Sequence, residues 1–156
     1  MLIYGCDPGF TGAIALYWTD TGKLEVHDMP VMKNTKGKAI INSPYLLDIL
    51  QNEANEKCLA LIEQVSAMPG QGVSSMFRFG EGYGMLQMAC AANKLPTQFV
   101  TAAKWKGYFG LNRDKGVSRG LAMQRFPEYA GLFGRVKDDG RAEAALIALY
   151  AAENMV

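Results

Sequence analysis

The stretch IYGCDPGFTGAIALY, from Ile3 to Tyr17, constrains the fold more than any other part of this chain. It consists of two apolar runs joined by a turn rich in glycine and proline, which is typical of two adjacent strands. A single carboxylate, Asp7, ends the first run, where burial makes a charge costly. That charge requires an explanation, and the other carboxylates of the chain provide one.

The composition indicates one soluble domain over residues 1–156. Hydrophobic residues make up 49% of the sequence, enough for a sizeable core. No apolar run reaches the roughly 18 residues of a membrane span, and no basic region precedes an apolar signal core. We therefore expect a cytoplasmic protein that binds no membrane. Three cysteines in apolar stretches indicate reduced thiols, and one histidine leaves too few ligands for a zinc site.

Hydrophobic patterning predicts an α/β fold with one mixed sheet and helices on both faces. The predicted strands are residues 2–7, 12–18, 24–29, 58–63 and 95–100. The predicted helices are residues 43–56, a long one that follows a 68–74 loop and ends near 93, one or two short basic ones within 104–126, and 138–154. We expect Ser43 to be the N-cap of the first helix, with Pro44 as its first residue. The Lys-rich stretch 31–42 is predicted to be a loop.

Four carboxylates are candidates for one site. Asp7 and Glu63 each end an apolar strand, so neighbouring strands bring them within a few ångströms of each other. Asp139 and Glu143 are four residues apart, and therefore share one face of the last helix. Like charges this close are unfavourable unless one is protonated or a cation lies between them. We predict a four-carboxylate cluster that binds cations, with scattered structural acids as the alternative.

Oxygen-only ligands suit Mg²⁺ or Mn²⁺ rather than Zn²⁺. Two such ions, about 3.5–4 Å apart, activate a water and stabilise the leaving oxygen in phosphodiester hydrolysis. The cluster therefore predicts two ions per site, with Mg²⁺ as the cofactor and Mn²⁺ able to substitute.

Several motifs resemble the RuvC-type Holliday-junction resolvases of the RNase H-like superfamily, in particular their phage and plastid branch. The acidic motifs are DPGFTGA at 7–13, IEQV at 62–65 and DDGRAEAALIA at 138–148. GEGYGMLQ at 80–87, WK at 105–106 and DKGVSR at 114–119 follow in the same order as in that branch. The resemblance implies an RNase H-like five-stranded mixed sheet, with three antiparallel strands and two parallel ones. It also implies a homodimeric endonuclease of DNA recombination and repair that makes paired symmetric nicks in four-way DNA junctions, with Mg²⁺ and no nucleotide cofactor. The host implied by the resemblance is a bacterial cell or a phage-infected cell.

The resemblance also assigns the acidic residues. Asp7 is implied to be the central ligand that bridges both metals, and Glu63 to hold one of them. Asp139 and Glu143 are implied to complete the site. In bacterial members the last two acids are three residues apart, whereas here Glu143 follows Asp139 by four and Asp138 by five. Which of Asp138 and Asp139 is the ligand stays open, and the spacing of four favours Asp139.

Basic and apolar residues complete the predicted DNA-binding surface. Between Val100 and Arg141 there are nine Lys or Arg residues and four acids, which form either a DNA-binding face or an ordinary solvated one. Lys106 and Lys115 match family lysines near the scissile phosphate, and Lys115 is assigned a catalytic role. The further predicted DNA contacts are Arg113, Arg119, Met68 and Phe77.

Family members insert the segment of Met68, Phe77 and Phe79 into the junction centre, whereas packing in the core or a dimer is the alternative for the phenylalanines. The glycine-spaced face of the long helix is the expected dimer contact.

Two other functions fit parts of the same sequence. An RNase H-like nuclease acting on flaps, forks or RNA–DNA hybrids would have an identical metal site. The DPGFTG turn also occurs in ATP-binding domains of the actin and sugar-kinase type, although these usually need two copies of the fold. A junction-over-duplex affinity ratio tests the first alternative, and ATP binding tests the second.

Overall fold

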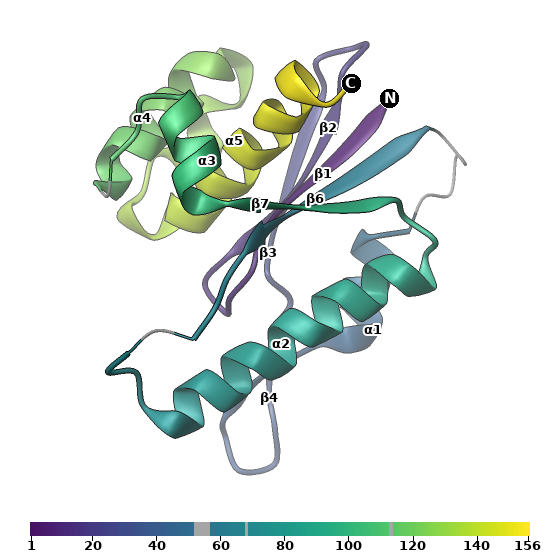
Figure 1. The fold of residues 1–156 in the computed structure, drawn as a ribbon, viewed down its shortest axis with the longest axis vertical. Coiled ribbons are helices and arrows are strands. Elements are labelled where there is room, and N and C mark those ends of the chain that lie inside the picture. Colours follow the sequence, from purple (N-terminus) through teal and green to yellow (C-terminus); the bar gives the residue numbers. More distant parts are fainter. Residues whose placement is uncertain (52–56, 68, 113) are drawn as a thin grey trace.

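The structure is a computed structural model that describes residues 1–51, 57–67, 69–112 and 114–156. Its centre is a five-stranded sheet in the order β3-β2-β1-β6-β7 (Figure 1). The strands are β1 Leu2–Asp7, β2 Ala13–Trp18, β3 Leu24–Asp28, β6 Cys58–Gln64 and β7 Thr97–Thr101. β1, β2 and β3 pair antiparallel, and β6 and β7 continue the sheet parallel to β1. The predicted RNase H-like arrangement of three antiparallel and two parallel strands is confirmed.

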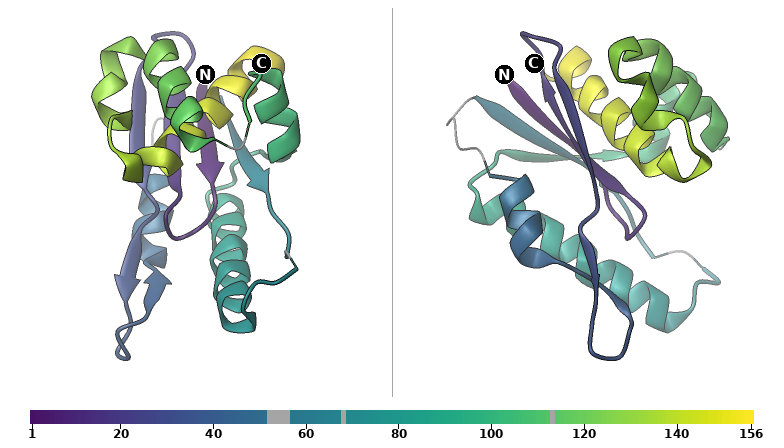
Figure 2. Two further views of the ribbon diagram at one scale, coloured as in Figure 1. Left: turned by 90° about the vertical axis from the view of Figure 1, so that its left-hand side faces the viewer. Right: turned by 180° about the vertical axis from the view of Figure 1, so that it is seen from behind.

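Helices cover both faces of this sheet (Figures 1 and 2). The helices are α1 Ser43–Ile49, α2 Val73–Ala92, α3 Ala102–Tyr108, α4 Lys115–Arg125 and α5 Asp139–Asn154. Two 3₁₀ segments, η1 Pro127–Phe133 and η2 Val136–Asp138, connect α4 to α5. One layer contains α3, α4 and α5, and the other contains α1 and α2.

β1 separates two buried clusters because its side chains alternate between the faces of the sheet. Ile3 belongs to the cluster with α5, whereas Leu2, Tyr4 and Cys6 belong to the cluster with α1 and α2. Gly5 faces α5, where a Cβ would lie 2.3 Å from the carbonyl oxygen of Ala144. α5 can therefore approach β1 more closely than any side chain at position 5 would permit.

Two local predictions were wrong. The stretch predicted as a loop contains a hairpin of β4 Val31–Lys33 and β5 Ala39–Ile41. Its Lys-rich composition suggested a loop, but Gly37 at φ +72° permits a tight turn that pairs the flanking residues.

The N-cap of α1 is Asn42 rather than Ser43, because its side chain accepts a hydrogen bond from Tyr45 N. Pro44 is therefore the second residue of α1 rather than the first, and α1 ends at Ile49. The rest of the helix predicted over 43–56 includes residues 52–56, which lie outside the described residues. Within the described parts of the chain, no helix has the length and apolarity needed to cross a membrane.

Candidate active site

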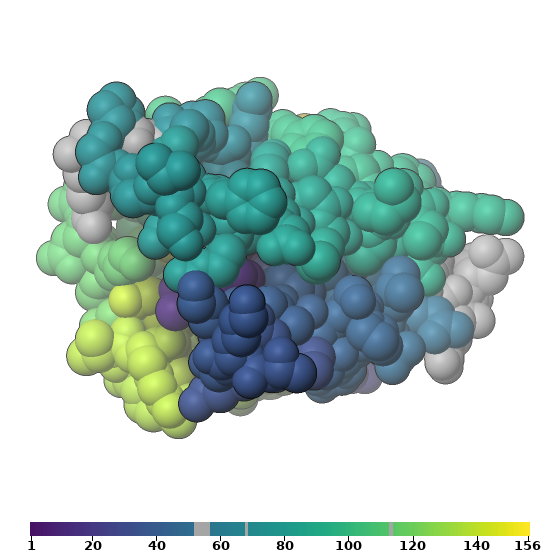
Figure 3. All heavy atoms as spheres, turned by 90° about the horizontal axis from the view of Figure 1, so that it is seen from below, coloured from purple at the N-terminus to yellow at the C-terminus, as the bar shows by residue number. Residues whose placement is uncertain are grey.

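Asp7 lies at the carboxyl end of β1, where the chain turns back sharply into β2. Gly12 N donates to Gly9 O at 3.1 Å, and Gly9 has a φ of +129°, which favours glycine. A Cβ at Gly12 would lie only 2.1 Å from the carbonyl oxygen of Asp7. These two glycines permit the tight turn next to Asp7. Figure 3 looks onto this end of the molecule and shows purple atoms, which belong to the N-terminal part of the sequence, between the teal and dark blue segments.

Glu63 lies next to Asp7 in the sheet. β1 and β6 pair in parallel with Cys6 opposite Ile62, so the following residues, Asp7 and Glu63, lie at the same level of adjacent strands. Directly paired residues of parallel strands point to the same face of the sheet. The predicted approach of these two strand ends is therefore present in the structure.

Glu143 reaches the same place from α5. It is only 7% exposed and lies among buried alanines, including Ala142 and Ala144. The close packing of α5 on β1 at Gly5 requires small residues on this helix face, and the alanines meet that requirement. A carboxylate among them is buried as a consequence of that packing.

The charges of these three carboxylates act on one another. Burial raises the pKa of Asp7 well above its usual range, Glu143 and Glu63 raise it further, and Lys115 and Lys106 oppose the rise. Burial also raises the pKa of Glu63, although a hydrogen bond from Trp105 opposes this shift. The three carboxylates therefore form an electrostatically unfavourable group that a bound cation would relieve.

Lys106 and Trp105 of α3 hold two of these carboxylates. Lys106 Nζ lies 2.8 Å from Glu143 Oε1, and Trp105 Nε1 donates to Glu63 Oε2 at 2.7 Å. The ammonium of Lys106 also lies 5.1 Å from the centre of the Trp105 ring. Trp105 is fully buried, so its indole is fixed by packing. The sequence analysis quoted Trp105 within a motif but gave it no role, because no local pattern connects it to a residue 42 positions earlier.

The two aspartates before Glu143 have different surroundings. Asp138 is 1% exposed, and its carboxylate accepts hydrogen bonds from the guanidinium and the backbone N–H of Arg135. These bonds hold the pKa of Asp138 below its usual value. Asp139 instead forms an ion pair with Arg119 from α4. Asp138 is therefore engaged in shaping the η2–α5 junction, whereas Asp139 lies one helical turn from Glu143.

As they stand, no three His, Cys, Asp or Glu side chains of the described residues are placed to hold a metal ion. Two of the four predicted ligands are paired with cations, Glu143 with Lys106 and Asp139 with Arg119. The donor chemistry nevertheless fits a hard divalent ion, since all four ligands supply carboxylate oxygens. The mutual repulsion around Asp7 points the same way.

The other predicted DNA-binding residues are spread over several elements. Lys115 begins α4 directly after its N-cap Asp114, and its charge acts on Asp7. Phe77 of α2 is 75% exposed, which excludes core packing for this side chain. Phe79 is partly buried and lies beside the Gly9 turn. Met68 and Arg113 lie outside the described residues.

The predicted basic face is largely neutralised within the protein. Of the eight cations that the structure describes between Val100 and Arg141, five form ion pairs, namely Lys106, Arg119, Arg125, Arg135 and Arg141. Arg141 pairs with Asp28 through two hydrogen bonds of 2.6 and 2.7 Å. A count of charges in the sequence therefore overstates the positive charge that this segment offers to DNA.

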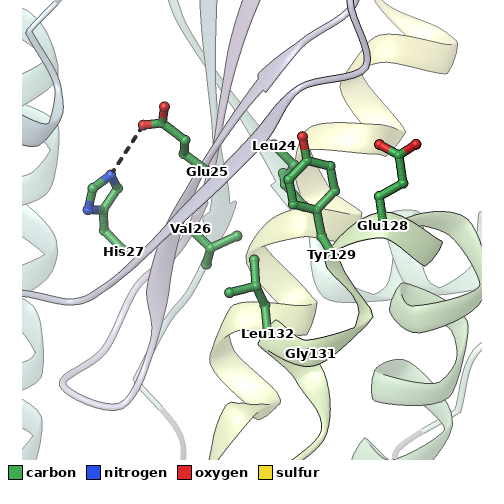
Figure 4. A pocket seen from close by; sticks show the side chains of 8 residues that line it. All are labelled: Leu24, Glu25, Val26, His27, Glu128, Tyr129, Gly131 and Leu132. Carbon is green, nitrogen blue, oxygen red and sulfur yellow. Dashed lines mark ion pairs between the residues drawn. The ribbon is translucent and has the colours of Figure 1, made fainter.

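A surface pocket of about 470 Å³ lies away from the carboxylates, between β3 and η1 (Figure 4). Leu24, Val26 and Leu132 contribute to its apolar part. Glu25 and His27, which form an ion pair at 3.9 Å, also line it. None of the predicted site residues lines this pocket, so it is separate from the candidate active site.

Comparison with known proteins places this geometry on a known fold. No protein-family model and no curated protein sequence matches the chain. Among solved structures, RuvC of Thermus thermophilus superposes with a TM-score of 0.62 at 14% identity, over 98% of this chain and 96% of that one. The T. thermophilus RuvC in complex with a Holliday junction substrate gives 0.60 at 15% identity, over 97% and 93%. The yeast mitochondrial Holliday junction resolvase Ydc2 gives 0.54 at 18% identity, over 96% and 77%. The chain therefore has the fold of the RuvC resolvases, as its motifs predicted.

Proposed function

We propose that this chain is a Holliday-junction resolvase, a divalent-metal-dependent endonuclease that makes paired symmetric nicks in four-way DNA. The observation that carries the proposal is the convergence of Asp7, Glu63 and Glu143 on a fold shared with RuvC. One of those RuvC structures contains a Holliday junction substrate. Neither the acids nor the fold would suffice alone, since RNase H-like sheets support several nucleic-acid reactions.

The proposed cofactor is Mg²⁺, with Mn²⁺ able to substitute, at two ions per site. When bound, these ions would supply an activated water and stabilise the leaving oxygen. Asp7, Glu63 and Glu143 would hold them, together with Asp139 after release from Arg119. Lys115 and Lys106 act on Asp7 from the side of α4 and α3, and supply positive charge where a cleaved phosphate becomes more negative.

The proposed assembly is a homodimer through the outer side of α2. Apolar and small residues form a stripe along this helix at spacings of three and four, and all are exposed: Val73, Phe77, Gly80, Gly84, Met88 and Ala91. The stripe continues into a shallow groove between α2 and β7 that Met88 and Phe99 help to line. A twofold dimer would place two sites on opposing strands of a twofold junction, as paired nicks require. Phe77, near the start of the stripe, is proposed to contact either DNA bases or the partner subunit.

A cleavage assay tests this function. Purified protein is incubated with a synthetic four-way junction, a flap, an RNA–DNA hybrid and a linear duplex, in Mg²⁺ or in EDTA. We expect paired symmetric nicks in the junction only, lost with EDTA, and no cleavage by the Asp7→Asn variant, which still binds the junction. Equal cutting of flap and junction would demote the substrate to branched DNA in general. Cleavage by Asp7→Asn would overturn the metal assignment, and no cleavage by the unaltered protein, even in Mn²⁺, would overturn the nuclease proposal.

A further inference from the structure

The β4–β5 hairpin is a well-defined element that has no role in the function proposed above. Val31, Met32 and Lys33 pair with Ile41, Ile40 and Ala39. At the tip, the side chain of Asn34 accepts hydrogen bonds from the backbone N–H groups of Lys36 (2.9 Å) and Lys38 (3.0 Å). Backbone bonds between Asn34 and Lys38 close the turn. The tip therefore has a defined conformation that does not depend on its lysine side chains.

The base of the hairpin is anchored to the body of the protein. Ile41 is buried, and its side chain would lie 3.3 Å from a Cβ at Gly82 of α2. Asn42 N donates to Pro30 O at 2.8 Å, which ties the two ends of the hairpin together. Its projecting part is consequently held in a fixed direction relative to α2.

The hairpin presents unneutralised positive charge. Lys33, Lys36 and Lys38 are exposed, and no acid occurs from Met29 to Leu47. Among the described residues, none of the three lysines forms an ion pair, in contrast to five of the eight described cations between residues 100 and 141. These lysines are on a projecting element and have no ion-pair partners. A polyanion would fit them better than an acidic patch of a folded protein, because the phosphates of a nucleic acid are regularly spaced along its backbone.

The hairpin also lies at the end of the molecule that holds the carboxylates. In Figures 1 and 2 it projects beyond the sheet, next to the N-terminal part of α2. Figure 3 looks onto this end and shows the hairpin, in dark blue, beside purple atoms from the N-terminal part of the sequence. A nucleic acid seated at the carboxylates would pass beside it.

We propose that the β4–β5 hairpin binds the sugar–phosphate backbone of a duplex arm of the substrate, outside the cleavage site. The phosphate backbone is the expected ligand because Lys33, Lys36 and Lys38 are exposed and form no ion pair, and lysine contacts to phosphate do not depend on base sequence. That this duplex is an arm of a four-way junction rests on the proposed function. The binding of duplex phosphates by the hairpin does not.

Paired lysine substitutions test this surface. Lys36→Gln with Lys38→Gln removes two charges from the tip and leaves the Asn34 turn intact, since that turn uses backbone groups. The matched control, Lys57→Gln with Lys94→Gln, removes two exposed charges near the start of β6 and the end of α2, at the opposite end of the sheet. Both doubles change the net charge equally. Affinity is measured in EDTA, without cleavage, over a series of salt concentrations, for a long-armed junction, a short-armed junction and a linear duplex.

We expect the hairpin double to lower the slope of log affinity against log salt by about 2 on the long-armed junction, since each phosphate contact contributes roughly 0.9. The short-armed junction and the control double should show little change. The proposal would be overturned if the two double variants had equal salt slopes on the long-armed junction, or if neither had a lower slope than the unaltered protein. These results do not depend on nicking. If the protein cleaves no substrate but the hairpin double lowers the salt slope, the proposed DNA-binding surface stands and the proposed function fails. If the protein cleaves the junction but the hairpin double leaves the salt slope unchanged, the proposed function stands and the proposed surface fails.

Discussion

The two longest helices, α5 and α2, lie on opposite faces of the same sheet and use their surfaces in opposite ways. Eleven of the sixteen residues of α5 are buried, whereas only three of the twenty in α2 are. α5 has alanines on the side that meets β1, and the sheet has a glycine there. α2 instead buries only Leu86, Ala89 and Cys90, and presents a stripe of other small and apolar residues to solvent.

The difference shows what small residues do in each helix. On α5 they bring two backbones into contact, which places Glu143 beside Asp7 with little freedom to move. On α2 they leave an apolar surface whose natural complement is another molecule. α5 therefore positions a carboxylate of the proposed site, and the exposed face of α2 is the proposed dimer contact.

The largest expected effect breaks the site on α5. Glu143→Gln should reduce the single-turnover rate of junction cleavage at least about a hundredfold, because it removes the charge of a proposed metal ligand. The matched change on α2, Glu81→Gln, alters an exposed carboxylate and should leave the rate unchanged. Junction binding by both variants checks that they are folded. Similar cleavage rates for the two variants would mean that Glu143 is only structural.

A glycine-to-alanine pair tests the packing of the same two helices. Gly5→Ala would put a Cβ 2.3 Å from Ala144 O and 2.4 Å from Ala148 N. Because both are backbone atoms, we expect the free energy of unfolding to fall by about 3 kcal/mol. Gly80→Ala in α2 meets open space and should raise it by roughly 0.5–1 kcal/mol. Urea unfolding measures the free energy of unfolding of both variants. A change of the same sign in the two would contradict the contrast between the packed face of α5 and the exposed face of α2.

Much of this interior was predictable from the sequence. Continuous apolar runs identified β1 and β6, and the Gly-rich turn after Asp7 identified the β1–β2 connection. Once these two strands are neighbours, the register alone brings Asp7 and Glu63 together. The spacing of four between Asp139 and Glu143 is a property of any helix. These inferences depend on local periodicity, which a sequence displays directly.

The pairing of charges was not predictable in the same way. Lys106 and Glu143 are 37 residues apart, and Arg141 reaches Asp28 across 113 residues. Such contacts depend on how elements pack, and no local pattern records them. The β4–β5 hairpin was overlooked for a different reason: its lysines suggested a loop, while the Asn34 and Gly37 turn that pairs its strands was the more informative signal. The roles of Met68 and Arg113 stay predictions.

The exterior of α2 is tested by a charge on its stripe. Met88→Lys would bury an unpaired ammonium in the proposed dimer contact, and we expect the dimer dissociation constant to rise about thirtyfold, equivalent to about 2 kcal/mol. Val136→Lys introduces the same charge at another exposed apolar position, outside α2, and should leave the constant unchanged. Sedimentation velocity over a concentration series measures both variants. A protein that stays monomeric throughout, or equal shifts for the two variants, would remove α2 as the interface.

The smallest expected effect concerns Glu63. This carboxylate lies on β6 and accepts a hydrogen bond from Trp105 of α3. Trp105→Phe keeps an aromatic ring in the core but removes the 2.7 Å hydrogen bond to Glu63. Because a hydrogen bond to a charged group contributes about 1.5–3 kcal/mol, and an alternative donor such as water can replace part of it, we expect a roughly tenfold slower cleavage step. Trp18→Phe, at the other tryptophan of the chain, loses the same atoms far from the carboxylates and should not slow cleavage. If both variants cleave at the unaltered rate while folded, packing alone positions Glu63, and the site depends on the sheet and α5 without help from α3.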